Sequence, residues 1–378
     1  MIVYTSEKGN KGFYTVDHNA KTVTFENSDY IISASLALYT ETDEKLLTQA
    51  YFDFKRIFKG ELMTLYRAKK YEGIKYYIRK VLNSRNFIFS FTNKPYILSK
   101  IAYFTFMGKQ VYINRPGYSL SLISDLARMK DDFTYPFLFT CKNLNDTNLR
   151  AICKVILNCP FYLTDFHNIL KRDIQRVYWN GGNDKFYEEL GKYNLHDKEY
   201  FDQYITGFNM ANIVERFTSG LKYSNGNEVR FIHADDYKYL DKVRLDLSFS
   251  KAEIEYKDKK QDNFLLLVDD LSNFVFSLVN DCMEIVNNNL SYNNELFDLL
   301  SYFFVHVSQQ NMEFQIPNSI WSTMMGIVDM CNESVSDFFK QNKMVDSVIA
   351  AHYTRINEYL KNHFDDKRAF SVYKVRVI

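Results

Sequence analysis

Three residues in the middle of the chain have the types and spacing that metal-dependent cleavage of phosphodiesters requires. Glu255 follows Asp246 by nine positions, and Lys257 follows Glu255 by two. Carboxylates on adjacent strands can hold a Mg²⁺ ion, and a lysine beside them can position the attacking water. Residues 243–249 and 252–257 are both predicted strands, with a turn near their junction. A metal-dependent nuclease is therefore one function to weigh.

This arrangement resembles the PD-(D/E)xK motif of a nuclease family. The resemblance implies that Asp246 and Glu255 hold the metal and that Lys257 assists the water. Leu245 stands where that motif has proline. The alternative is that Glu255 and Lys257 form the exposed side of an edge strand. We favour this alternative, and with it a protein that is not an enzyme.

The other residues with catalytic or ligating side chains form no recognisable site. His233, Asp235 and Asp236 offer possible metal ligands, but an acidic turn explains them as well. His352 and His363 lie on one face of a predicted helix, where we expect them to pack in the core or an interface. The sequence has no Walker A, GxGxxG, GxSxG or HExxH motif, and its cysteines lack zinc-binding spacing. We expect no metal and no cofactor.

The clearest global signal is the distribution of charge. The net charge is only +1, from 47 Lys and Arg against 46 Asp and Glu. Residues 45–115 nevertheless contain 15 Lys and Arg and only three acidic residues, Asp53, Glu61 and Glu72. Residues 258–366 contain 16 acidic residues against 6 basic ones. Such asymmetry suggests a polyanionic partner, or pairing of one end of the chain with the other.

The basic residues are placed where they can form one surface. On two predicted helices they stand away from the apolar stripe, and Tyr and Phe residues are interleaved with them. A Lys/Arg face gains free energy by releasing counterions from phosphates, and adjacent aromatic rings can stack on unpaired bases. The candidate nucleic-acid-binding residues are Lys55, Arg56, Lys59, Lys69, Lys70, Lys75, Arg79, Lys80, Arg85, Lys94, Lys100, Lys109 and Arg115.

We therefore expect a non-enzymatic, self-associating protein of a virus, phage or mobile element that binds RNA or single-stranded nucleic acid. Because no helix-turn-helix, zinc-finger, RRM or KH signature is present, we expect binding that is independent of base sequence. Two alternatives stay open for the basic residues, namely a solvated face or one neutralised by the acidic C-terminal section. A third possibility is an assembly subunit with no nucleic-acid role.

Composition bounds the class of protein and its source. With 29 Tyr and 32 Phe against 13 Gly and 5 Pro, the chain has too much aromatic surface to stay disordered. AT-rich codons, which many viruses, phages and mobile elements use, produce the same bias. The sequence has neither a signal-peptide pattern nor an apolar run of about 20 residues. We expect a cytoplasmic protein with free thiols, in the host cytoplasm if the source is a virus.

The apolar patterns predict an α+β fold in three parts. Residues 1–132 form a basic, aromatic-rich α+β domain, and residues 133–257 form an α+β middle section. Both contain short antiparallel strands. Residues 258–378 form an acidic, mainly α-helical section with a β-like tail.

Local periodicity predicts the individual elements. The predicted strands cover residues 12–16, 22–25, 30–39, 87–91, 101–106, 111–113, 228–233, 243–249 and 252–257. The predicted helices include 43–58, 74–82, 147–158, 164–176, 198–221, 264–286, 293–308, 318–331, 335–342 and 344–364. The alternating residues 369–378 must be paired, either in their own sheet or on a neighbouring subunit. The second arrangement would build a homo-oligomer.

Overall fold

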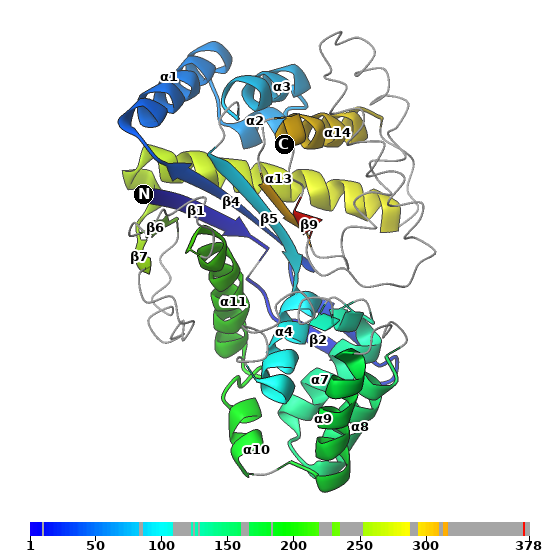
Figure 1. The fold of residues 1–378 in the computed structure, drawn as a ribbon. Coiled ribbons are helices and arrows are strands. Elements are labelled where there is room, and N and C mark those ends of the chain that lie inside the picture. Colours follow the sequence, from blue (N-terminus) through cyan, green and yellow to red (C-terminus); the bar gives the residue numbers. More distant parts are fainter. Residues whose placement is uncertain are drawn as a thin grey trace.

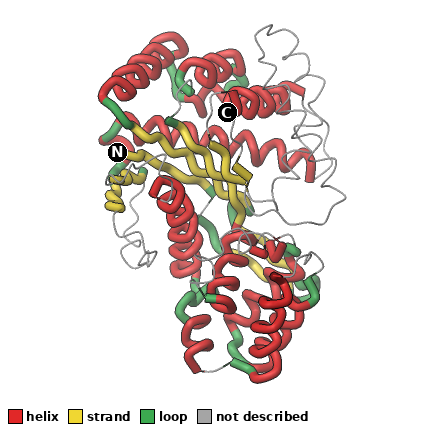
Figure 2. The backbone as a smooth tube through the Cα atoms, viewed as in Figure 1, coloured by secondary structure: helices red, strands yellow, loops and turns green. Residues whose placement is uncertain are grey.

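A mixed seven-stranded sheet lies at the centre of the computed structural model, with helices on both of its faces (Figures 1 and 2). The order of the strands is β7-β6-β1-β4-β5-β8-β9. They are β1 (Ile2–Lys8), β4 (Tyr30–Leu38), β5 (Phe87–Asn93), β6 (Val229–His233), β7 (Ala252–Tyr256), β8 (Glu313–Ile316) and β9 (Tyr373–Lys374). The predicted α+β class is confirmed, and the C-terminal section is largely helical where it is described.

The structure describes only part of the chain, and the structural statements below concern that part. The described residues are 1–9, 11–82, 86–108, 122–123, 125–127, 129–159, 166–182, 184–218, 229–234, 252–287, 294–309, 313–316 and 373–374.

The middle of the sheet is antiparallel, and its flanks contain parallel pairs. β4 pairs antiparallel with β1 and with β5, whereas β6 runs parallel to β1, and β7 to β6. Side chains alternate between the two faces of a strand. In β4, Ile32, Ala34 and Leu36 therefore enter the core on one face, and Ser33 and Ser35 lie buried on the other.

Five helices cover the first face of the sheet (Figure 1). They are α1 (Glu41–Phe58), α2 (Leu62–Arg67), α3 (Tyr71–Lys80), α13 (Asn263–Asn287) and α14 (Asn294–Gln309). α13 packs on β1, β4 and α2, and α14 packs on α3. Thr40 begins α1 with a capping box to Asp43, and Lys59 ends it in the left-handed conformation.

The opposite face of the sheet is covered by α11 (Lys198–Thr218), which extends into a helical lobe (Figure 1). The lobe contains α4 (Lys94–Met107), α7 (Asp131–Lys142), α8 (Asp146–Leu157), α9 (Phe166–Asn180), α10 (Asp184–Gly191) and the hairpin of β2 (Tyr14–Asp17) and β3 (Thr22–Phe25). A short 3₁₀ helix, η1 (Lys259–Gln261), precedes α13.

Each large core joins distant parts of the chain. The core under α1, α3 and α13 combines residues 4–89 with residues 232–303. The core of the helical lobe runs from residue 14 to residue 205. Folding therefore packs the acidic C-terminal section directly against the basic N-terminal section.

Residues 101–106 were expected to form a strand, and this prediction is wrong because they belong to helix α4. Asn93 caps this helix by accepting a hydrogen bond from Tyr96 N at 2.8 Å, and Pro95 lies in its first turn. Residues 94–104 are all buried. A helix buried all round has no polar side, so its sequence lacks the period by which a surface helix is recognised.

Several other predicted elements are confirmed, among them the hairpin β2–β3, helix α3 and the long helix α13. Residues 111–113, 243–249, 318–331, 335–342 and 344–364 lie outside the described residues. Of the predicted tail, Tyr373 and Lys374 are described, and they pair antiparallel with β8 of the same chain. None of the helices in the described part of the chain is long and apolar enough to cross a bilayer.

Candidate nucleic-acid interface

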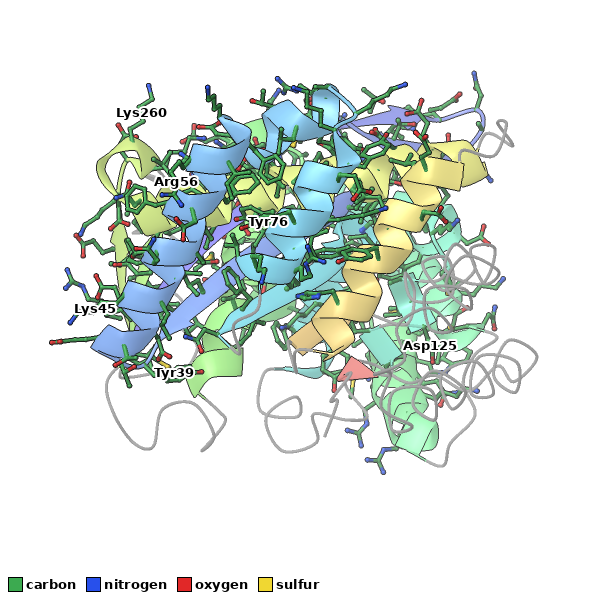
Figure 3. All side chains as sticks on the ribbon, turned by 90° about the horizontal axis from the view of Figure 1, so that it is seen from above. Tyr39, Lys45, Arg56, Tyr76, Asp125 and Lys260 are labelled. Carbon is green, nitrogen blue, oxygen red and sulfur yellow. The ribbon has the colours of Figure 1, made fainter. Side chains whose placement is uncertain are left out.

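The outward side of α1 presents an aromatic ring among cations. Leu47, Tyr51 and Phe54 point into the core, whereas Phe52 is 51 % exposed. Lys45 precedes Phe52 by seven positions and Arg56 follows it by four, so the three share one side of the helix. Lys45 and Arg56 are both exposed (Figure 3).

The loop after α1 and the helices α2 and α3 extend this surface. Lys59, Arg67, Lys69, Lys70, Arg79 and Lys80 are all exposed. They lie on the outside because Leu62, Leu65, Ile74, Tyr77 and Ile78 fill the core beneath them. We call the exposed and partly exposed side chains of residues 45–80 the basic face; Figure 3 looks onto it, with Tyr76 marking α3.

Local acidic residues neutralise only a small part of the basic face. Arg56 pairs with Asp53 at 2.9 Å, and Lys75 pairs with Glu72 at 3.1 Å. Both pairs are largely exposed, so they contribute little and solvent screens them. Lys59, Lys69, Lys70 and Lys80 form no ion pair with any described residue. These lysines keep their charge available for an external anion.

Two of the predicted binding residues are inside the protein. Lys94 is fully buried, and its Nζ donates to Lys11 O and Gly12 O at 3.3 Å and to Glu26 O at 3.1 Å. Burial lowers the pKa of Lys94 to about 8, against the opposing effect of Asp202 and Asp29. Lys100 is only 2 % exposed. Because phosphates cannot reach either ammonium group, we remove both lysines from the interface.

The other predicted binding residues either lie on the basic face or fall outside the described residues. Lys55, Arg56, Lys59, Lys69, Lys70, Lys75, Arg79 and Lys80 all belong to the basic face. Arg85, Lys109 and Arg115 lie outside the described residues. Ile57 continues the apolar period of α1, but it is half exposed. The exposure of Phe52 was not predicted, although its position opposite Leu47 and Phe54 is readable from the helical period.

Acidic residues of α13 contact the N-terminal section, but they bond to backbone and hydroxyl groups there and not to the exposed lysines. Asp270 accepts hydrogen bonds from Leu62 N at 2.7 Å and Met63 N at 3.1 Å, at the first turn of α2. Burial raises the pKa of Asp270 to about 6. Asp281 accepts from the hydroxyl of Tyr66 at 2.5 Å. These carboxylates therefore stabilise the packing under the basic face without pairing with its exposed lysines.

Asp269 lies further along the sheet and binds two lysines outside the basic face. Its carboxylate is 2.7 Å from Lys8 Nζ and 2.6 Å from Lys259 Nζ. Burial acts to raise the pKa of Asp269, but the two ammonium groups outweigh it and hold this pKa below its usual range. The carboxylate is therefore ionised and fully engaged.

The nuclease residues are only partly described. Glu255 and Lys257 lie at the edge strand β7 and its end, and Asp246 lies outside the described residues. Hydrogen bonds from Arg230 and Lys257 lower the pKa of Glu255, and Lys257 Nζ is 3.1 Å from its carboxylate. In the described part of the chain, no three His, Cys, Asp or Glu residues converge to hold a metal ion.

Comparisons with protein-family models, with curated proteins and with solved structures found no match to this chain.

Proposed function

We propose that the basic face binds RNA or other single-stranded nucleic acid without reading its sequence. The observation that carries the proposal is the exposed ring of Phe52 between Lys45 and Arg56, beside lysines that form no ion pair with any described residue. The cations would hold backbone phosphates and release counterions. The ring would stack on a base, which only an unpaired strand can offer freely. We place this function in the cytoplasm, where free thiols persist.

The test is a salt titration of binding to fluorescently labelled single-stranded RNA, with single-stranded DNA and duplex DNA in parallel. Affinity for both single strands should fall steeply with KCl, with a slope of about −0.7 per bound phosphate. Lys59→Ala/Lys70→Ala should weaken binding and make this slope shallower by roughly 0.7 for each phosphate that the variant no longer neutralises.

Lys142→Ala/Lys154→Ala is the matched control, because both lysines are exposed but lie on α7 and α8 of the helical lobe. This variant should bind RNA like the unmodified protein. Binding that does not respond to salt, or an equal loss in both double variants, would contradict the proposal. Preference for duplex DNA would contradict the role of Phe52.

A further inference from the structure

A second aromatic surface lies on the basic face, where α1 and α3 meet. The rings of Phe58 and Tyr76 are 5.2 Å apart and tilted by 57°. Both side chains pack against the core, and both are partly exposed to solvent. Tyr76 is labelled on this face in Figure 3. The basic face therefore presents aromatic surface at the seam of two helices as well as at Phe52.

A glycine in α3 explains how the two rings come together. Gly73 precedes Tyr76 by three positions, so it lies about one turn earlier in the helix. A Cβ on Gly73 would be 3.0 Å from Phe58 Cδ1 and 3.0 Å from Leu65 Cδ1. Any larger residue would crowd both side chains in this close-packed seam. The glycine therefore leaves room for the Phe58 ring to lie against α3, next to Tyr76.

Tyr76 of α3 has the same kind of neighbour as Phe52 of α1. Arg56 follows Phe52 by four positions, and Lys80 follows Tyr76 by four. Residues four apart lie side by side on a helix, so each ring has a cation about one turn away. Both cations are exposed, and Lys80 forms no ion pair with any described residue. Each ring can therefore stack on a base while its cation holds a phosphate.

The two aromatic surfaces are too far apart for neighbouring stacked bases. Phe58 follows Phe52 by six positions, which is about 9 Å along the axis of α1. The same six positions place the two side chains about 120° apart around that axis. Successive bases in a helically stacked strand are only about 3.4 Å apart. A strand that reaches both surfaces must therefore keep the two bases unstacked from each other.

We propose that one unpaired strand crosses the outward side of α1 and stacks one base on Phe52 and another on Tyr76. This inference rests on the proposed function of the basic face, and it names the ligand as a flexible strand of several nucleotides without base stacking. Ile57 is 51 % exposed beside Arg56, where the strand would cross. Once one base is bound, the second contact is intramolecular, which raises the overall affinity.

The experiment varies the number and spacing of bases at constant charge. The full-length chain is titrated with labelled DNA strands of one length, in which abasic sites replace every base except one or two thymines. All strands carry the same phosphates, so counterion release is the same for each. A second thymine, separated from the first by several abasic positions, should tighten binding about fivefold or more, the lower end for one base–aromatic stack. Two adjacent thymines should gain less.

Tyr76→Leu should abolish the gain from the second thymine and leave binding of the one-thymine strand almost unchanged, because Phe52 remains. Leucine keeps an apolar contact with Phe58 but has no ring for a base. Phe52→Leu, at an exposed position, should abolish the same gain and serves if Tyr76→Leu does not fold. Tyr135→Leu is the matched control, because Tyr135 is also partly exposed but lies on α7.

The outcomes separate this inference from the proposed function. An equal gain in Tyr76→Leu and the unmodified protein, or a gain that does not depend on spacing, overturns the two-ring contact and leaves the nucleic-acid interface standing. Loss of the gain in Tyr135→Leu also overturns it. If no strand binds, with or without thymines, both the inference and the proposed function are wrong.

Discussion

Phe52 and Phe54 stand two positions apart on α1 and have opposite environments. Phe54 is fully buried, with its ring 5.5 Å from that of Phe58 and 4.8 Å from that of Tyr77. Phe52 points outward, and half of its surface meets solvent. One phenylalanine therefore serves stability, and the other is available to a ligand.

Alanine substitutions at these two positions should separate binding from stability. Phe54→Ala should cost about 3–5 kcal/mol in the free energy of unfolding, because it empties a packed site. Phe52→Ala should leave urea unfolding almost unchanged and weaken binding to single-stranded RNA by about 1–3 kcal/mol. Equal RNA affinity in Phe52→Ala and the unmodified protein would exclude stacking by this ring.

His306 makes the fold sensitive to acid. It is buried in α14, and burial, with a smaller effect from Arg79, lowers its pKa to about 4. In the unfolded chain a histidine has a pKa near 6.5, so the unfolded state binds more protons between these two values. The contribution of this histidine therefore lowers the free energy of unfolding as the pH falls from about 6.5 to about 4.

His306→Leu should remove most of that dependence. The difference in the free energy of unfolding between the variant and the unmodified protein should change by on the order of 3 kcal/mol between pH 7 and pH 4. Thermal unfolding followed by circular dichroism across this range provides the measurement. His196→Leu, which changes an exposed histidine, should follow the unmodified protein; a parallel pH profile for His306→Leu would contradict the assignment.

At the scale of elements, the short helix α2 depends on a carboxylate from another part of the chain. Six residues are too few to form a stable helix alone. The side chain of Glu61, the N-cap residue of α2, forms no hydrogen bond to the first turn of the helix. Asp270 of α13 takes that place by accepting the hydrogen bonds of Leu62 N and Met63 N. α2 and the lysines that follow it are thus positioned by the acidic section.

Asp270→Ala tests this dependence. The buried N–H of Leu62 and the partly buried N–H of Met63 would lose their acceptor, so the free energy of unfolding should fall by about 1–3 kcal/mol. Urea denaturation measures the loss, and Asp132→Ala, which removes an exposed carboxylate on α7, should change little. RNA affinity should also fall if α2 positions Lys69 and Lys70. A stability equal to that of the control would show that α2 does not need Asp270.

At the scale of the whole molecule, the two oppositely charged sections meet in one core. α13 packs on α2 and α14 packs on α3, and two carboxylates of α13, Asp270 and Asp281, bond there to backbone and hydroxyl groups. The basic face remains outward. At the other edge of the sheet, β9 pairs with β8 of the same chain and forms the last strand.

Self-association through the tail remains a prediction at this scale. If residues 369–378 are exchanged between subunits, their deletion should lower the molar mass measured by light scattering to that of one chain. A parallel measurement at high salt would separate strand exchange from contacts between charged surfaces, which salt screens. An unchanged mass after deletion would remove the exchange hypothesis and agree with pairing inside the chain.

Local features of the sequence were sufficient to predict the α+β class, the hairpin β2–β3, and helices such as α3 and α13. Their side-chain periods arise from the backbone geometry of each element, so a short window contains the information. Charge segregation is likewise visible without a structure. The helix α4 could not be recognised in this way, because burial on all sides erases the period.

Which charged residues are available to a ligand follows from packing and not from the sequence. Lys94 and Lys59 look alike in the sequence, yet one is enclosed by backbone carbonyls and the other is exposed without an ion pair to any described residue. The meeting of Phe58 and Tyr76 likewise depends on the packing of α1 against α3. The amphipathic elements and the separation of charge could be read from the sequence, because both are local. Exposure and convergence arise between residues far apart along the chain, so only packing decided them.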